Sequence, residues 1–373
     1  MSISDRVLKN DEKAIYRLRE LYSSFGYMRY KVSKFEEYDL YARNKSFLVS
    51  KNILTFTDTD GRLMALKPDV TLSIIKNVDD KTTHKLYYNE NVYRTSASAD
   101  GFREIVQTGL ECIGRIDIYS MSEVVMLAQR SLDIISSDNI LDISHMGFML
   151  GLIDNLGIEG ADADELVGYI GHKNIPAIKA FCVSHGIFES EASELCAMTS
   201  LYAPIADALK MLEGMVRGER MREAYEQLRG ICSLLSEVCD VERIYLDFST
   251  VNDMNYYNGI TFKGFVKGIP DGILSGGRYD TLLSKMGKRS GAIGFAVYLD
   301  MLERLSEGSS EYDVDTVLLY DDSADALLLA KTIKSIGEMG VTLRAEYGDS
   351  TSYRCRKLLK LTAKGVETIE TND

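Results

Sequence analysis

The spacing of apolar residues predicts that the chain begins with a helix followed by short strands. Residues 5–26 carry apolar side chains every three or four positions with charges on the opposite face, which indicates an amphipathic helix. Strand-like runs follow at 45–57 and 63–66, and the Thr-Asp-Gly sequence at 59–61 predicts the turn between them. This part of the chain is therefore expected to have mixed α and β structure.

A hairpin is predicted next. Residues 85–95 and 102–114 both have strand-like sequences, and a glycine-containing loop joins them. Arg94 lies at the entry to this loop and Arg103 at its exit. The hairpin would therefore hold two cationic side chains near its tip.

Helical patterns replace strand patterns between residues 150 and 238. A helix at 122–136 and a strand at 140–148 are predicted before this stretch, and its clearest helix is at 222–238. Because strand patterns resume afterwards, we interpret 150–238 as a helical insertion within a larger sheet domain. The later strands are predicted at 243–249, at 256–266 and from residue 291, where a strand passes into a helix.

The last part of the chain, residues 311–373, is predicted to be a separate small unit following a core of residues 1–310. Its pattern alternates strand and helix, which suggests a small, mainly parallel α/β fold. The predicted segments are a strand at 314–320, a helix at 324–340, a strand at 341–347 and a helix at 352–365.

Composition narrows the class of protein. The chain has 373 residues, is 45% hydrophobic and carries a formal charge of −13, so its surface as a whole repels phosphate backbones and anionic membranes. Residues 1–27 lack the apolar region of a signal peptide, and no segment approaches the roughly 18 apolar residues of a membrane span. A cytoplasmic protein with no membrane partner is expected.

No metal, cofactor or common catalytic motif is expected. The cysteines contain no C-x-x-C pair and the histidines are scattered, so the thiols are predicted to be reduced and structural. The sequence also lacks a P-loop, a nucleophile elbow and a dinucleotide fingerprint. The cysteines are Cys112, Cys182, Cys196, Cys232, Cys239 and Cys355, and the histidines are His84, His145, His172 and His185.

Three acidic or amide side chains are candidates for a binding site. Asp69 follows a proline at the start of an apolar helix, where it would serve either as a helix cap or as a ligand-facing carboxylate. Gln107 and Glu111 are four residues apart on one strand and therefore share a face. A half-buried Glu111 suits an amine or imidazolium ligand, although a solvated glutamate fits the pattern equally well.

Tyrosines and glycines supply a second group of candidates. Tyr256 and Tyr257 lie where a turn enters a strand, and Tyr279 follows the pair Gly276 and Gly277. Glycines permit close approach of the backbone to a ligand, and Tyr279 would cover a small one. Each signal is weak alone, but their order and strand–loop–strand settings support one another.

Taken together, these segments resemble those of histidyl-tRNA synthetase, a class II synthetase, over roughly residues 5–370. The matching stretches are LKPDVT, YRTSASADGFREIVQTGLECIG, MNYYNGITF, SGGRYDTLL and GAIGFA. The resemblance implies an α+β fold in which flanking helices cover a class II antiparallel sheet. It also implies a homodimer formed through about residues 5–57, and a truncated anticodon-binding-like unit at 311–373.

The resemblance further implies a histidine-binding pocket. In that family Asp69 and Thr71 would contact the ligand amine, and Gln107 and Glu111 its amino and imidazole groups. Tyrosines would line the imidazole side, and a cation would hold the carboxylate. The tyrosines are Tyr256, Tyr257 and Tyr279, and Arg103 is the nearest candidate cation by motif position.

The chain departs from the synthetase pattern at the positions that activate the amino acid. Aminoacyl-adenylate formation needs fixed positive charge on the ATP phosphates. The expected motif 2 glutamate is Ser96, the motif 3 arginine is Met301, and the catalytic arginine of the pocket is Asn252. The motif 1 proline is replaced by Ser33. Such a pocket keeps what binds an amino acid and lacks what activates it.

A synthetase-like chain with these losses resembles the family of regulatory subunits of ATP phosphoribosyltransferase, the first enzyme of histidine biosynthesis. That resemblance implies a non-catalytic, allosteric subunit that assembles with a short catalytic subunit into a hetero-octamer and takes part in feedback by histidine. Residues 313–373 contain eight Lys or Arg against eleven Asp or Glu, which disfavours tRNA as a partner.

Other functions remain open at this point. A divergent but active histidyl-tRNA synthetase is one, because Arg94, Arg103 and the glycine-rich segments are retained. A separate sensor that binds histidine or tRNA is another, and a relic pocket that binds nothing is a third. ATP–pyrophosphate exchange would identify the first, and co-purification with a short phosphoribosyltransferase would argue against the second.

Overall fold

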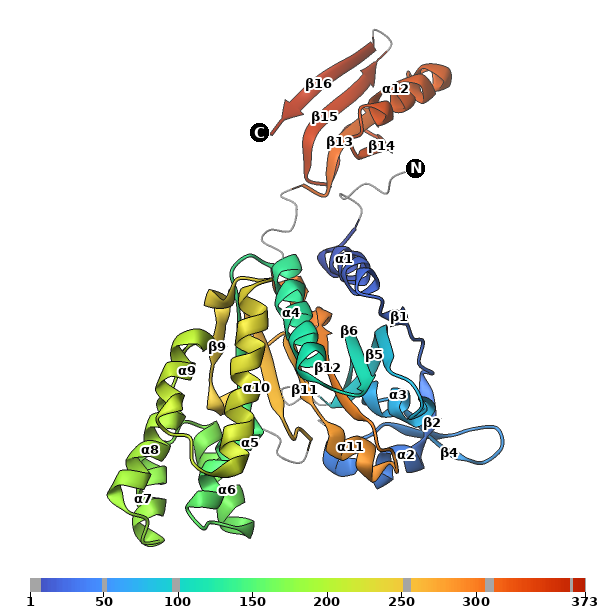
Figure 1. The fold of residues 1–373 in the computed structure, drawn as a ribbon. Helices are drawn as coiled ribbons and strands as arrows, with labels where there is room; N and C mark the ends of the chain where they lie inside the picture. The colour runs from blue at the N-terminus through green and yellow to red at the C-terminus, as the bar shows by residue number, and fades with distance from the viewer. Residues whose placement is uncertain are drawn as a thin grey trace. The chain divides into compact units, whose positions relative to one another are not determined.

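The computed structural model describes residues 8–48, 52–95, 101–250, 256–305, 312–362 and 365–372. The chain divides into two compact units, residues 1–305 and 306–373, which are described separately here (Figure 1). Within the described residues, no helix is both long and apolar enough to cross a membrane.

The first unit is built on a nine-stranded sheet with the order β1-β5-β6-β12-β11-β10-β7-β9-β8 (Figure 1). The pairing is antiparallel except between β1 and β5 and between β7 and β9. The strands are β1 Met28–Arg29, β5 His84–Thr95, β6 Phe102–Gly114, β7 Asn139–His145, β8 Ala203–Pro204, β9 Ile244–Leu246, β10 Ile260–Val266, β11 Leu274–Arg278 and β12 Gly291–Tyr298. This sheet confirms the mixed α+β fold expected from the sequence.

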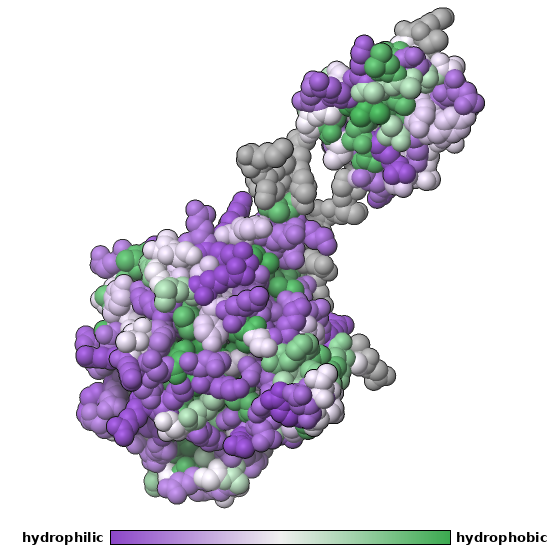
Figure 2. Space-filling model, turned by 90° about the vertical axis from the view of Figure 1, so that its right-hand side faces the viewer, coloured by the Kyte–Doolittle hydropathy of each residue, from purple (hydrophilic) through white to green (hydrophobic). Residues whose placement is uncertain are grey.

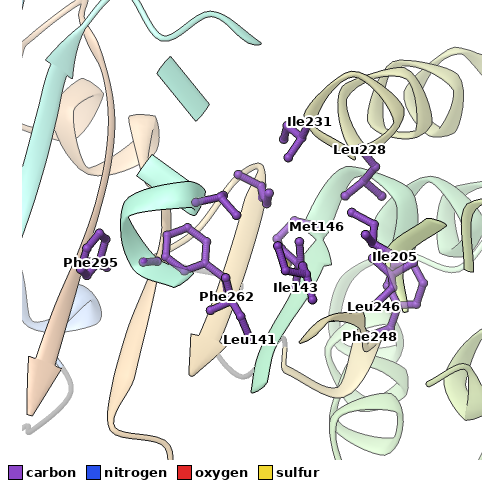
Figure 3. Close-up of a cluster of buried hydrophobic side chains, with 14 of the residues drawn as sticks. Leu141, Ile143, Met146, Ile205, Leu228, Ile231, Leu246, Phe248, Phe262 and Phe295 are labelled. Carbon is purple, nitrogen blue, oxygen red and sulfur yellow. The ribbon is translucent and has the colours of Figure 1, made fainter. Parts of the chain in front are cut away.

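One face of the sheet is apolar and is covered by helices. Helices α1 (Asn10–Ser24), α4 (Ile118–Ile135) and α10 (Gly218–Ser236) contribute buried side chains to the core that includes Phe262 and Phe295 of the sheet. Figure 3 shows part of this core, including Leu228 and Ile231 of α10 together with Phe262 and Phe295 of the sheet. Burying this face provides the main stabilisation of the unit, at roughly 25 cal/mol per Å² of apolar surface.

A second, smaller core packs beside the sheet. It contains α3 (Thr71–Asn77), α11 (Asp280–Lys285) and side chains of β5 such as Leu86. A three-stranded sheet with the order β2-β4-β3 belongs to the same part of the unit. The remaining elements there are β2 Phe35–Glu37, α2 Tyr38–Arg43, η1 Lys45–Phe47, β3 Thr55–Thr57 and β4 Leu63–Leu66.

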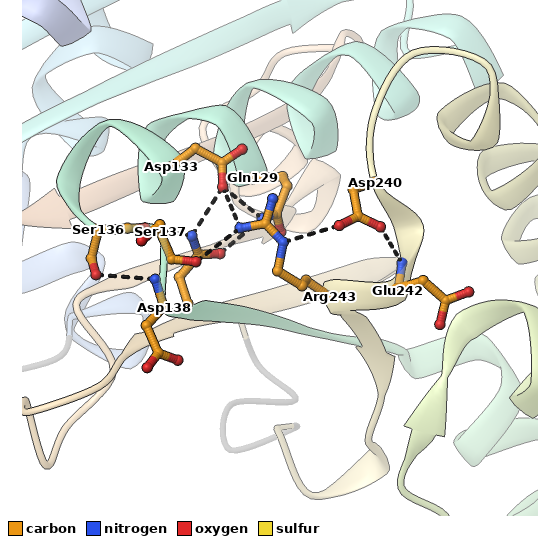
Figure 4. A network of polar contacts seen from close by, with 9 residues as sticks. Gln129, Asp133, Ser136, Ser137, Asp138, Asp240, Glu242 and Arg243 are labelled. Atoms are coloured by element: carbon orange, nitrogen blue, oxygen red, sulfur yellow. Dashed lines mark hydrogen bonds and ion pairs between the residues drawn. The ribbon is translucent and has the colours of Figure 1, made fainter.

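A group of helices separates β7 from β9 along the chain, as expected for the helical insertion. They are α5 Met146–Asn155, α6 Gly160–Gly171, α7 Ile175–Ser184, α8 Glu189–Ser200, α9 Ile205–Glu213 and α10, with η2 Val241–Arg243 and η3 Phe248–Thr250 at the return. An ion pair of 2.8 Å between Lys173 and the buried carboxylate of Asp247 joins the insertion to the return. Arg243 links the same return to α4 through Asp133 at 2.7 Å (Figure 4).

The second unit differs from its prediction after residue 351, where the structure has two strands. Its strands are β13 Val314–Tyr320, β14 Leu343–Tyr347, β15 Cys355–Thr362 and β16 Gly365–Thr371, and its helix is α12 Ala326–Glu338. The predicted helix at 352–365 is therefore wrong, because residues 355–362 form β15. This strand pairs in parallel with β13 and antiparallel with β16, so backbone pairing on both sides fixes the extended form.

Two other local predictions need correction. The run at 45–57 forms the 3-10 turn η1 and only a three-residue strand, β3, within its described part. The predicted helix after β12 is the 3-10 helix η4, Leu299–Leu305. By contrast, the predicted hairpin strands at 85–95 and 102–114 correspond closely to β5 and β6.

Figure 2 shows that charged and polar residues dominate the face of the molecule turned to the viewer, with scattered apolar patches. Exposed apolar residues scattered singly are normal on a protein surface.

Candidate functional site

A cavity of about 610 Å³ lies on the face of the sheet opposite the helix-covered core. Strands β6, β12, β11 and β10 provide its floor, because their register sets cross-strand neighbours in rows. One row runs from Glu111 through Gly294 and Gly277 to Thr261, and the next places Ala296, Ser275 and Lys263 side by side. Directly opposed residues point to the same face, so both rows face the cavity.

Small residues in the middle of this floor leave room for longer side chains. A β-carbon at Gly294 would overlap the Oε2 atom of Glu111. Gly276 belongs to the other face of the sheet, where Phe262 and Phe295 are its cross-strand partners and a β-carbon would lie 2.6 Å from the Phe262 ring. Tyr257 lies against Gly277 in the same way, because a β-carbon at Gly277 would meet its ring at 2.7 Å. The glycine pair marked as permissive in the sequence is therefore required by packing.

Glu111 is the central acidic group of the cavity and is almost completely buried. Its Oε1 accepts a hydrogen bond from the Thr71 hydroxyl at 2.7 Å, and its Oε2 accepts one from the Tyr279 hydroxyl. Burial raises the pKa of Glu111 to about 8, although both hydrogen bonds oppose the shift. The cavity thus contains a carboxyl group that a cationic ligand would ionise.

Asp69 combines the two roles that the sequence left open. Its Oδ1 accepts from the Leu72 N–H at 2.9 Å at the start of α3, which is a capping contact. It also lines the cavity. Burial raises the pKa of Asp69, while Arg94 and backbone donors act in the opposite direction.

Two buried polar groups on the cavity floor lack a hydrogen-bond partner among the described residues. They are the amide nitrogen Nε2 of Gln107 and the hydroxyl of Thr261, in side chains that are only 2% and 3% exposed. An unsatisfied buried polar group costs about 1–3 kcal/mol. A polar ligand or ordered water in the cavity would remove this cost.

Three tyrosines form an aromatic wall. Tyr256 contacts Tyr257 with ring centroids 4.6 Å apart and Tyr279 at 5.6 Å. Burial raises the pKa of all three hydroxyls, so they stay neutral at physiological pH. The wall suits a flat ring, and Tyr279 also connects it to Glu111.

The structure brings most of the predicted site residues together but places Arg103 elsewhere. Asp69, Thr71, Gln107, Glu111, Tyr256, Tyr257 and Tyr279 all line the cavity. Arg103 is exposed and does not line it. Asn252 and Ser96 lie outside the described residues, and Met301 is partly buried against the core.

Arg94, not Arg103, is the buried cation of the cavity. It is 8% exposed, and its Nε donates to the Pro68 carbonyl at 2.8 Å. Burial alone would lower its pKa, but Tyr298 and Asp69 raise it above the usual value, so the guanidinium is charged. Lys45 and Lys263 also line the cavity.

Several lining residues do not follow from the sequence. The sequence places Arg94 at the entry to the hairpin loop and among the retained synthetase residues, but not in the pocket, and it does not single out Thr261, Lys263 or Ser275. Strand alternation alone would have placed Thr261 and Lys263 on one face of β10. Only the register of β10 against β11 and β7 shows that this face is the one toward Glu111.

The part of the chain that the structure describes contains no cluster of three or more His, Cys, Asp or Glu side chains fit to hold a metal ion. The six cysteines are free. The residues that line the cavity offer groups for recognising a small polar molecule. They provide carboxyl groups for an amine or imidazole, an aromatic wall for a ring and a buried guanidinium for an anion.

The chain is similar in sequence and fold to known proteins. The family model for histidyl-tRNA synthetase matches residues 4–302. An ATP phosphoribosyltransferase regulatory subunit/histidyl-tRNA synthetase from Bacillus halodurans C superimposes with a TM-score of 0.75 at 23% identity, covering 94% of this chain and 92% of that chain. A chain of the ATP phosphoribosyl transferase (HisG:HisZ) complex from Thermotoga maritima gives 0.62 at 19% identity, covering 78% and 97%. The family model thus places the chain in the histidyl-tRNA synthetase class, and the two structures show the same fold.

A curated relative narrows this class. The ATP phosphoribosyltransferase regulatory subunit of Caldanaerobacter subterraneus subsp. tengcongensis is 33% identical over 312 residues, which cover 78% of each chain. The chain belongs to the family of ATP phosphoribosyltransferase regulatory subunits.

Proposed function

We propose that this chain is a non-catalytic regulatory subunit of ATP phosphoribosyltransferase and that it binds histidine in the cavity. The observation that carries the binding proposal is the buried Glu111, held by Thr71 and Tyr279 beside the unpartnered amide of Gln107. Family membership and the name of the curated relative support the regulatory role.

Each polar group of histidine finds a partner in this arrangement. Asp69 and Glu111 take the ammonium group and an imidazole N–H, and Gln107 supplies a free donor. The tyrosine wall encloses the ring. Arg94 takes the carboxylate, in place of Arg103, which lies outside the lining. A buried ligand needs each of these partners, because an unpaired polar group is costly to desolvate.

The chain is proposed to lack the activating step of a synthetase. Met301 packs against the core where the family's motif 3 has an arginine, and methionine offers no charge to neutralise phosphates. The chain would instead form a homodimer and act, in the cytoplasm, within a hetero-octamer that includes a short catalytic subunit. The name of the Thermotoga maritima complex supports such a partnership.

The regulatory role is tested by mixing experiments. The purified chain alone should show no phosphoribosyltransferase turnover, and it should raise the rate of a short catalytic subunit added to it. Turnover by the chain alone, or no stimulation of the partner, would contradict the proposal.

The binding role is tested with Glu111→Ala. This change strands the Thr71 and Tyr279 hydroxyls, so histidine binding measured by calorimetry should weaken at least about tenfold. Histidine inhibition of the assembled enzyme should be relieved in parallel. An unchanged inhibition curve would place the feedback site outside this cavity.

A divergent histidyl-tRNA synthetase is the second candidate, because the buried Arg94 lines the cavity as a motif 2 arginine would. ATP–pyrophosphate exchange that depends on histidine would establish it. The regulatory proposal expects none.

A further inference from the structure

A second cleft, of about 880 Å³, lies at the end of the sheet where β6 finishes and β12 begins, beside α11 (Figure 1). The turn after α3, around residues 80–83, forms one wall, and the segment 288–291 before β12 forms another. Gly114 and Gly291, which are cross-strand partners, lie between the walls. None of its lining residues also lines the candidate histidine cavity.

The charge of this cleft is opposite to that of the chain. The lining contains two carboxylates, Asp80 and Asp280. It also contains five cationic side chains, which are Lys81, Arg115, Arg278, Lys288 and Arg289. The chain as a whole has 56 acidic against 43 basic residues, so this surplus of positive charge is local.

Both carboxylates are occupied in fixing the walls. Asp80 accepts from the Arg289 backbone N–H at 3.0 Å and from the Ser290 hydroxyl at 2.7 Å. Asp280 accepts from the Ala292 N–H at 2.9 Å and pairs with Arg278 at 2.8 Å. These bonds shape the cleft. Of the other cations, Lys288 interacts electrostatically with Asp80, and Arg115 with Asp117, but neither forms an ion pair within 4 Å in the described parts of the chain.

The four remaining cations make no ion pair within 4 Å in the described parts of the chain. Arg278 is the one lining cation that pairs there, with Asp280. Lys288 donates only to the Val78 carbonyl, which is neutral. Two further carboxylates lie nearby, but Asp79 engages the Lys81 backbone and His84, and Asp117 caps α4. Charges of one sign gathered in a cleft raise the local concentration of a counter-ion.

We propose that this cleft binds a compact polyanion, namely a small molecule that carries a pyrophosphate or similar phosphate group. A concave site with several convergent cations suits a ligand with two or more negative charges, because Lys and Arg are the usual partners of phosphate oxygens. The net charge of −13 disfavours an extended polyanion such as a nucleic acid, which would run beyond the cleft onto acidic surface.

The test is calorimetric titration of the full chain with inorganic pyrophosphate at low ionic strength. Binding is expected, and it should weaken on raising the salt concentration, as for any exposed charged site. The double variant Arg115→Ala with Arg289→Ala should bind at least about tenfold more weakly. Only the side chain of Arg289 is removed, so its backbone bond to Asp80 stays. Thermal unfolding confirms that the variant is folded.

A matched control removes the same charge elsewhere. Lys179 on α7 and Lys331 on α12 are exposed, and replacing both with alanine should leave pyrophosphate binding within about twofold of the original. The charge-preserving double variant Arg115→Lys with Arg289→Lys should retain most of the affinity.

Three results would overturn the proposal. The first is no binding of pyrophosphate, and the second is equal loss in the control and the cleft variants. The third is binding of an acidic peptide such as oligoglutamate without pyrophosphate, which would make the cleft a docking site for protein. None of these measurements depends on histidine binding. They therefore test the pyrophosphate proposal independently of the proposed function.

Discussion

Gly294 and Glu111 are directly opposite each other on neighbouring strands, and the carboxylate of Glu111 occupies the space that a side chain at 294 would need. The backbone carbonyl of Leu110 is the next nearest atom to that space. The position of the central acid of the cavity therefore depends on the absence of one β-carbon.

Gly294→Ala should disturb this site directly. The new methyl group would displace the Glu111 carboxylate or strain the pair of strands, at a cost of about 1–3 kcal/mol in unfolding free energy. Histidine binding should be lost or strongly weakened, as measured by calorimetry. Gly168→Ala is the control, because it lies in α6 with no neighbour within 4 Å of an added β-carbon. It should stabilise the fold by about 0.5–1 kcal/mol. Retention of full histidine affinity by Gly294→Ala would contradict the proposal that histidine binds in this cavity.

Glu111→Gln should change the pH dependence of stability. The carboxyl keeps its proton in the folded chain up to a pKa of about 8, against 4.5 for the ordinary group. Its contribution to stability is therefore fully present below pH 4.5 and is lost as the pH rises toward 8. Glutamine cannot ionise and still reaches Thr71 and Tyr279. The melting temperature of the variant, relative to the original, should thus rise between about pH 5 and pH 8.5.

Calorimetry across this pH range checks that expectation. Glu189→Gln removes the same charge at an exposed position of α8. The difference in melting temperature between this variant and the original should not change with pH. A flat difference for Glu111→Gln as well would mean that the carboxyl is ionised in the folded chain.

The long elements that their own sequences specify were predictable, whereas short elements and strand β15, which its neighbours hold extended, were not. Strands β5 and β6 follow from their own sequence, because composition and turn agree. Residues 355–362 were predicted as helix, since Leu358, Leu359 and Leu361 have helix-like spacing. Pairing with β13 and β16 overrides that spacing. The local sequence pattern of a segment does not show which distant strands will pair with it.

The same limit applies to the candidate site. The spacing of Glu111 and Gln107 places them on one face of a strand. The resemblance of their motif to that of histidyl-tRNA synthetase then indicates that this face binds a ligand. The choice between Arg94 and Arg103 could not be made, because the two are cross-strand partners and share a face. The difference arises from the Pro68 carbonyl and Asp69, which draw Arg94 inward and belong to another segment.

Arg94 should therefore govern recognition of the ligand carboxylate. Arg94→Ala removes the buried cation and should weaken histidine binding at least about tenfold. Histamine, which has the imidazole and amine but no carboxylate, should lose much less affinity. The ratio of the two affinities separates loss of the carboxylate contact from general damage to the cavity.

Arg103→Ala is the matched control for this prediction. Arg103 is exposed, so its removal should leave both affinities within about twofold of the original. The reverse result, with Arg103→Ala alone weakening histidine, would restore the assignment that the motif position suggested.

The edge of the large sheet should carry the proposed homodimer contact. Strand β1 is the outermost strand, and Met28 on it is 67% exposed. Phe35, at the start of β2 on the edge of the separate three-stranded sheet, is 46% exposed. Exposed apolar side chains on a sheet edge favour association, because unpaired backbone groups and apolar surface both gain partners.

Met28→Asp would place a charge in that contact, so it should shift the chain toward monomer in sedimentation experiments at micromolar concentration. Phe188→Asp, which changes a 74% exposed residue just before α8, should leave the dimer intact. A monomeric original chain, or equal dissociation in both variants, would count against an interface at this edge.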